Sequence, residues 1–119
     1  MYICSMQEKF ETKILQEAKD FLASLDRKTR KKILFNIWKS KLQNDKTLFK
    51  PLEREIWEFR TLYNKKYLRL FAFWDKTDKE STLVVATHGI IKKTAKVPKK
   101  EIDKAVRIRK EYFQNKNNK

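Results

Sequence analysis

Arg60 and Arg69 are the residues of this sequence whose type and spacing best suit chemistry on an anion. Arg60 belongs to residues 56–63 and Arg69 to residues 67–74, and in both segments the residues alternate with the period of two that a half-buried strand requires. Residues 64–65 (Asn-Lys) can form a hairpin turn between them, because asparagine tolerates a positive φ. Counting back from this turn predicts that Arg60 lies directly opposite Arg69.

This arginine pair predicts a binding site for phosphate. Like charges placed opposite each other destabilise a sheet, and an anion bound between the two arginines would remove their repulsion. A guanidinium suits phosphate because its planar fork grips the oxygens with two bonds. The alternative is that each arginine simply pairs with a carboxylate, since Glu58 is predicted on the same face, which we expect to be uncovered. The same register places Glu58 opposite Phe71, Leu62 opposite Tyr67 and Ile56 opposite Phe73.

The other face of the predicted hairpin is apolar and needs a cover of helices. Its expected pairs are Trp57 with Ala72, Phe59 with Leu70 and Thr61 with Leu68.

Two helices before the hairpin are the natural cover for that face. A short strand at residues 10–15 leads into a helix whose apolar residues fall at helical spacing, and Asp26 is a plausible N-cap for a second helix that ends near Leu42. The apolar residues of the two helices are Ala18, Phe21, Leu22 and Leu25, then Ile33, Leu34, Ile37 and Trp38. We expect a helical hairpin, followed by a loop over residues 44–50 that Pro51 keeps out of helix.

The chain after the hairpin predicts a third hairpin-connected strand, a basic loop and a helix. Residues 82–91 are rich in β-branched side chains and apolar enough for a central strand buried on both faces. Residues 90–96 leave that strand with several lysines, and Pro98 suits the first position of a final helix. Residues 114–119 are expected to fray as a C-terminal tail.

Length and charge bound the class of protein. A chain of 119 residues and 14.5 kDa predicts a single domain, residues 1–119, with one hydrophobic core. The net charge of +15 attracts nucleic acid or another polyanion. An anionic membrane is the competing partner, but no segment is long and apolar enough to span one. With a single cysteine and no apolar signal segment at the N-terminus, we expect the cytoplasm.

Several site classes are not expected. Gly89 is the only glycine, so no glycine-rich phosphate loop or nucleotide fingerprint is present. His88 and Cys4, one of each and far apart in sequence, cannot supply a zinc ligand set. We therefore expect neither a metal nor a cofactor.

Three segments carry a resemblance to a known family: WEFR (57–60), YLRLFAFW (67–74) and THGIIKKTAKVPKKEIDKA (87–105). They resemble the phage-derived, HigB-type branch of the RelE/ParE toxin superfamily, and the likeness covers nearly the whole chain. It implies an α+β, RelE-like fold: an antiparallel sheet of about four strands, an N-terminal helical hairpin on one face and a C-terminal helix.

The same resemblance implies a toxin of a type II toxin-antitoxin system. The implied activity is ribosome-dependent, metal-independent endoribonuclease cleavage of mRNA, which inhibits translation, and the implied partner is a helix-turn-helix antitoxin. Fold alone does not settle the target. A ParE-like gyrase poison and a non-catalytic, basic nucleic-acid-binding module therefore stay open.

The resemblance also implies site residues. Arg60 falls on the arginine after the WEL-type motif and Arg69 on the arginine of the next strand, and we expect both to hold the scissile phosphate. The basic loop motif falls on Lys92, Lys93, Thr94 and Lys96. We expect Lys92 and Lys93 to add positive charge next to the scissile phosphate. We further expect Lys65 and Lys66 of the hairpin, together with Thr94 and Lys96 of the loop, to contact the RNA.

The proton-transfer residues are expected among Glu58, His88 and Tyr67. Glu58 is the candidate base, and His88 or Tyr67 the candidate acid. His88 lies in an apolar strand, so a hydrogen-bonded core histidine is the alternative for it. Tyr67 could equally stack on an RNA base.

Overall fold

The computed structural model describes residues 9–43, 45–77, 82–92, 94 and 96–117. Within them the chain forms a five-stranded sheet of order β1-β5-β4-β3-β2, with helices on both faces. The elements in chain order are β1 (Glu11–Ile14), α1 (Gln16–Ala23), α2 (Arg27–Leu42), β2 (Phe49–Pro51), β3 (Trp57–Tyr63), β4 (Lys66–Asp75), β5 (Leu83–Lys92) and α3 (Lys99–Asn117).

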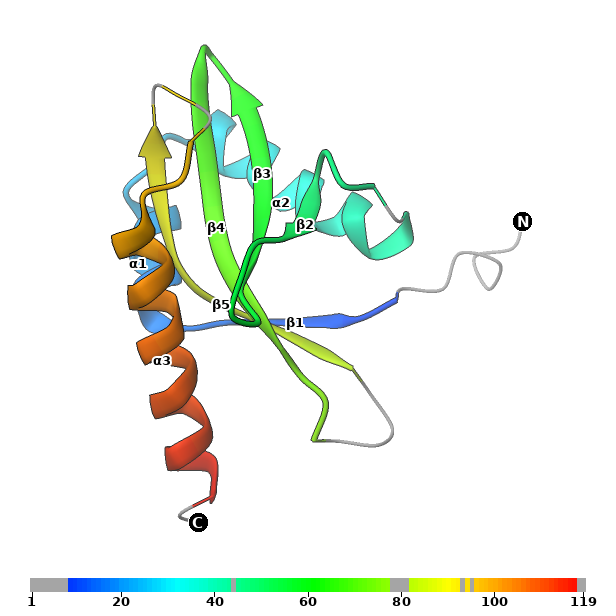
Figure 1. Ribbon diagram of the computed structural model, residues 1–119. Coiled ribbons are helices and arrows are strands. Elements are labelled where there is room, and N and C mark those ends of the chain that lie inside the picture. Colours follow the sequence, from blue (N-terminus) through cyan, green and yellow to red (C-terminus); the bar gives the residue numbers. More distant parts are fainter. Residues whose placement is uncertain (1–8, 44, 78–81, 93, 95, 118–119) are drawn as a thin grey trace, which may run out of the picture.

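The sheet separates two apolar clusters, and Figure 1 shows α3 on one side of it with α1 and α2 on the other. The cluster under α1 and α2 includes Phe59, Leu68 and Leu70 of the sheet, and the cluster under α3 includes Phe71 and Phe73. Alternate residues of one strand thus face different helices, as the period of a strand requires.

The β3–β4 hairpin has the predicted turn and register. Asn64 and Lys65 both have positive φ, at 55° and 65°, which is the backbone of a type I′ turn. Arg60 pairs with Arg69 and Glu58 with Phe71, as counted from the turn. Ile56 lies just before β3, so its expected pairing with Phe73 is not part of the ladder.

A β-bulge in β5 changes which residues face α3. Phe71 pairs with His88 and Ala72 with Ala86, so Thr87 is left as the extra residue. Val85 and His88, three positions apart, can therefore both point toward α3. Val85 belongs to the apolar cluster under α3, and the His88 ring stacks on Phe71 of the same cluster. Without the bulge, the period of two would send them to opposite faces.

Gly89 allows α1 to pack closely on β5. A Cβ atom at this position would lie 2.2 Å from Cδ2 of Phe21, which is closer than any packed side chain tolerates. The only glycine of the sequence therefore serves the contact between helix and strand.

The strand predictions need two corrections. The sheet has five strands and is mixed, because β1 pairs with β5 in parallel, whereas an antiparallel sheet of about four strands was expected. The additional strand, β2, begins inside the segment predicted as a loop, residues 44–50, and ends at Pro51. Its Phe49 pairs with Phe59 and is buried in the cluster under α1 and α2.

Helices form in the three segments where they were predicted, but α3 begins at Lys99 and not at Pro98, and α2 does not bury every residue that was expected to be buried. Asp26 caps α2, accepting hydrogen bonds from the backbone nitrogen and hydroxyl of Thr29 at 3.1 and 2.6 Å. On α2, Ile33 and Ile37 are buried as expected, but Leu34 and Trp38 are exposed.

The inner face of α2 uses a polar residue where an apolar one was expected. Asn36 is buried and donates a hydrogen bond of 3.0 Å to Oγ1 of Thr61. Because this bond satisfies both side chains at the interface, Asn36 can face the sheet in place of Leu34 or Trp38.

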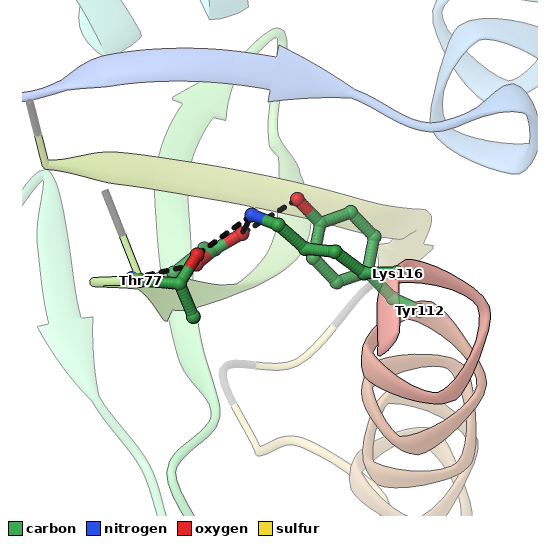
Figure 2. Close-up of polar contacts among 4 residues, drawn as sticks. Thr77, Tyr112 and Lys116 are labelled. Atoms are coloured by element: carbon green, nitrogen blue, oxygen red, sulfur yellow. Dashed lines mark hydrogen bonds and ion pairs between the residues drawn. The ribbon is translucent and has the colours of Figure 1, made fainter. Parts of the chain in front are cut away.

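The position of α3 is fixed at its C-terminal end by a buried carboxylate (Figure 2). Asp75 is 1% exposed and accepts hydrogen bonds of 2.7 Å from Tyr112, Lys116 and Thr77. Residues 114–117, expected to fray, lie in the last turn of α3, and residues 118–119 lie outside the described residues. Asp75 thus holds the helix against the end of β4.

Among the residues described, no helix is both long and apolar enough to cross a membrane.

Candidate functional site

A charged triad of Glu58, Arg60 and Arg69 lies on the sheet face that carries α3. Nε of Arg69 is 3.2 Å from Oε1 of Glu58, and Nε of Arg60 is 3.4 Å from Oε2 of the same carboxylate. The side chains of Glu58 and Arg69 are each 2% exposed, whereas that of Arg60 is 27% exposed. The structure therefore realises the carboxylate pairing that was the alternative for these arginines, and it buries Arg69 on a face that was expected to be uncovered.

The triad carries an excess positive charge at a buried place. Burial raises the pKa of Glu58, while the charges of Arg69 and Arg60 oppose the rise. Burial also lowers the pKa of Arg69, against the attraction of Glu58. In both cases desolvation outweighs pairing, which is the expected balance for an ion pair out of water.

The ion pairs of the triad leave hydrogen-bonding capacity unused. Nε of Arg60, Nε of Arg69 and Oε1 of Glu58 are buried and make no well-directed hydrogen bond to any described residue. Arg69 also donates from Nη1 to the carbonyl of Leu68, at a long 3.3 Å. Buried polar atoms in native proteins are normally satisfied, and these three are closed off from solvent. The accessible part of the triad is therefore Arg60, whose side chain is 27% exposed.

A basic groove of about 820 Å³ opens above Glu58. It runs between β2, the chain that leads into α3, and the first turn of α3. Its lining residues are Lys50, Leu52, Glu53, Glu58, Lys96, Val97, Pro98, Lys99 and Ile102. Three lysines against two carboxylates make the groove cationic even before the triad arginines are counted.

Tyr67 and Lys92 extend the same face beyond the triad. Tyr67 pairs with Leu62 on one side and with Lys92 on the other. Cζ of Arg69 lies 5.3 Å from the centre of the Tyr67 ring, within cation–π range. The structure therefore brings Arg60, Arg69, Tyr67 and Lys92 together on neighbouring strands.

Of the predicted RNA contacts, Lys96 lines the groove, whereas Lys65, Lys66 and Thr94 do not. Lys65 is exposed in the hairpin turn and Lys66 is exposed at the start of β4, and neither lines the groove. Thr94 is exposed, and Lys96 does line the groove. Lys93 lies outside the described residues.

His88 is in the core, 2% exposed, and is hydrogen-bonded at both ring nitrogens. Nε2 lies 3.0 Å from Oε1 of Glu101 on α3, and Nδ1 lies 3.0 Å from the hydroxyl of Thr87. Burial lowers the pKa of His88, and the Glu101 hydrogen bond acts against that change. This environment matches the core histidine that was the alternative for His88.

Sequence reasoning missed Lys50 and Lys99 as groove residues. Lys50 was placed in a loop, but it belongs to β2 and pairs with Glu58 across the ladder. Lys99 is the first residue of α3. The run of lysines from 92 to 100 was a usable signal for Lys99, whereas nothing in the local pattern indicated that β2 would carry Lys50 to the triad.

No group of three or more His, Cys, Asp or Glu side chains is arranged to hold a metal ion in the part of the chain that the structure describes.

Comparison with known proteins identifies the family of the chain. No curated protein matches the chain. The family model for "Phage derived protein Gp49-like (DUF891)" matches residues 20–110, which include α2, the sheet from β2 to β5 and most of α3. The chain therefore belongs to the Gp49-like family of phage-derived proteins, one of the RelE/HigB-like toxin families of toxin-antitoxin systems.

Proposed function

We propose that this chain is the toxin of a type II toxin-antitoxin system and that it cleaves mRNA on the ribosome without a metal ion. The observation that carries the proposal is the half-satisfied triad of Glu58, Arg60 and Arg69 beside a cationic groove. Family membership supports the toxin role and an antitoxin partner. We further propose that the partner is a helix-turn-helix antitoxin and that the pair acts in the cytoplasm.

Arg60 is the proposed contact to the scissile phosphate. It is the partly exposed member of the triad, and its ion pair with Glu58 is made through Nε, at 3.4 Å. Its terminal guanidinium nitrogens can then bind two phosphate oxygens, which stabilises the charge that builds on phosphorus. Arg69 is buried behind it and acts through Glu58 and Arg60 as a positioning residue.

The lysines of the groove are proposed to hold the RNA backbone on either side of that phosphate. The groove is lined by Lys50, Lys96 and Lys99. Lys92, on β5, pairs with Tyr67 of the neighbouring strand β4. Each contact of this kind neutralises a phosphate without reading sequence, so binding should be salt-dependent.

The proposed reaction is attack of the ribose 2′-oxygen on the adjacent phosphorus. The new O2′–P bond forms as the P–O5′ bond breaks, which leaves a 2′,3′-cyclic phosphate and a 5′-hydroxyl. Glu58, with its pKa raised by burial, takes the 2′-hydroxyl proton, and Tyr67 gives a proton to the leaving O5′. His88 has no part in this scheme because both of its ring nitrogens are engaged inside the core.

The test compares Arg60→Ala with an arginine control outside the groove. Arg107 is exposed on α3 and does not line the groove, so Arg107→Ala removes the same charge elsewhere. After induced expression, new 5′ ends within translated frames should be seen with the wild type and Arg107→Ala but not with Arg60→Ala. Arg60→Lys should restore only part of the cleavage, since a point charge lacks the two-bond grip.

Two results would overturn the proposal. Intact transcripts beside a stalled gyrase–DNA complex would establish a gyrase poison. RNA binding without growth arrest would leave only a basic binding module.

A further inference from the structure

The outer face of α2 carries an exposed apolar cluster that the fold itself does not use. Leu34, Phe35 and Trp38 are 45%, 49% and 46% exposed. They fall at helical spacings of three and four, so they share one face of the helix, and the Phe35 and Trp38 rings are 5.8 Å apart. We call these three residues the α2 patch.

The α2 patch is bordered by cations. Arg27 and Lys31 precede Leu34 at helical spacing on the same face, both exposed, and Nζ of Lys32 lies 5.8 Å from the centre of the Phe35 ring. The sequence of α2, RKTRKKILFNIWKSKL, contains no Asp or Glu. The patch is therefore an apolar centre at the edge of a strongly positive surface.

Folding does not explain this composition. The inner face of α2 is complete without the patch, because Ile33 and Ile37 fill the cluster on the sheet and Asn36 bonds to Thr61. Three large apolar side chains left half exposed on one helix mark an interaction surface, since single proteins rarely expose such groups together.

The α2 patch and the basic groove are on opposite faces of the sheet. Figure 1 shows α2 behind the strands and α3, whose first turn borders the groove, in front of them. A partner bound to the patch therefore does not need to contact Arg60 or Glu58.

We propose that the α2 patch is the docking surface for the antitoxin, through an acidic amphipathic helix of that protein. This inference rests on the proposed toxin-antitoxin function. The apolar face of such a helix would cover Leu34, Phe35 and Trp38, and its carboxylates would meet Arg27 and Lys31.

Charge and shape favour this occupant over others. A second copy of the chain would bring a like charge of +15 against the same surface. RNA would gain from the cations, but Leu34 offers no ring for a base and the Phe35 and Trp38 rings already contact each other. Aromatic residues are enriched at the centres of protein interfaces and tryptophan is enriched among their hot spots, so Phe35 and Trp38 inside a charged rim suit a protein partner.

The first test measures affinity for the protein encoded beside this chain's gene. Trp38→Ser and Leu34→Ser should each weaken binding at least 30-fold, about the loss typical of a truncated hot spot. The matched control is Leu62→Ser, which removes a 60% exposed leucine from the other face and should leave this affinity unchanged. Circular dichroism and melting should show all three variants folded, because each changes an exposed side chain.

The second test addresses charge. The association rate should fall steeply with added salt, and Lys31→Glu should lower it and flatten the salt dependence. In cells, Trp38→Ser should stay toxic when the neighbouring protein is co-expressed, whereas the wild-type toxin is neutralised.

Each other occupant gives a distinct result that would overturn the proposal. Weaker binding of a fluorescent oligouridylate by Trp38→Ser would assign the patch to RNA, and loss of a dimer in sedimentation would assign it to a second copy. Loss of binding to phosphatidylserine vesicles would assign it to a membrane. If the neighbouring protein fails to bind the wild type, or binds every variant equally, the patch is not its docking surface.

The failure of this inference can be told apart from failure of the proposed function. Loss of cleavage in Arg60→Ala with undiminished antitoxin binding by Trp38→Ser would keep the function and reject the docking surface. Loss of antitoxin binding in Trp38→Ser, with no RNA cleavage by the wild type, would keep the docking surface and reject the proposed cleavage of RNA.

Discussion

Replacing Arg69 should destabilise the protein much more than replacing Arg60, although the two are cross-strand partners. The side chain of Arg69 is 2% exposed and 3.2 Å from Glu58, which is equally buried. Removing one partner of a buried ion pair costs about 3–5 kcal/mol, because the other charge is left uncompensated. Arg60 remains 3.4 Å from Glu58 and supplies part of the missing charge, so we expect about 2–3 kcal/mol for Arg69→Met.

This loss can be measured as a melting temperature. For a chain of 119 residues, 1 kcal/mol corresponds to about 4 °C, so Arg69→Met should melt about 8–12 °C below the wild type. Arg60→Ala should melt within about 4 °C of it, because Arg60 is partly solvated and Glu58 keeps Arg69. Toxicity should be lost in both variants, in Arg60→Ala without a stability defect.

A double-mutant cycle separates the ion pair from the loss of packing. Glu58→Gln alone should also be destabilising, but the double variant Glu58→Gln/Arg69→Met should recover about 2 kcal/mol relative to the sum of the single changes. Urea unfolding at neutral pH gives the four free energies of unfolding. Additive changes, or an Arg69→Met variant that melts like the wild type, would show that Arg69 is not held by a buried pair and would refute the reasoning.

Two further predictions concern the acid stability of the fold and the proposed general acid. Burial acts to raise the pKa of Asp75, but hydrogen bonds from Lys116, Thr77 and Tyr112 outweigh it and hold the pKa well below its usual range. A depressed folded pKa contributes stability above the unfolded value of about 3.9 that is lost as pH falls toward the folded value. Asp75→Asn should therefore lower the melting temperature at pH 7 and reduce its fall between about pH 5 and pH 2, and parallel pH curves for the two proteins would contradict this. Tyr67→Phe should slow single-turnover cleavage of ribosome-bound mRNA about 10²-fold or more with little change in binding, and an unchanged rate would remove Tyr67 as the acid.

The hairpin that carries the site could be predicted from the sequence because its information is local. Strict alternation on both sides of residues 64–65 fixes the faces, and Asn64 with Lys65 fixes the turn, so the pairing of Arg60 with Arg69 follows by counting. The burial of Arg69 could not be obtained in this way. It depends on the tertiary packing of the sheet, in which β5 pairs with β4 on the side away from β3 and Glu58 pairs with the Arg69 side chain.

The face of His88 was beyond sequence reasoning for a different reason. Alternation along the sequence predicts which face a side chain occupies only while the strand pairing is regular. The bulge at Thr87 shifts the pairing of the later residues of β5 by one position, so their side chains face the opposite side from the one that alternation predicts. Neither Thr87 nor the residue on either side of it is a glycine or proline, and Gly89, two positions later, serves the contact with Phe21. The hydrogen bond from His88 to Glu101 then depends on where α3 lies, which the pattern of β5 does not contain.

The misassigned face of α2 has a physical reason that also bears on its partner. Periodicity identifies apolar residues at helical spacing, but it does not say which of two apolar faces meets the sheet. In α2 one face carries Ile33 and Ile37, and the other carries Leu34 and Trp38. A hydrogen bond between Asn36 and Thr61 decides between them, because a buried amide must have a partner and Thr61 offers one. The apolar residues in excess of what the core needs are thus turned outward, where only binding to another molecule can bury them.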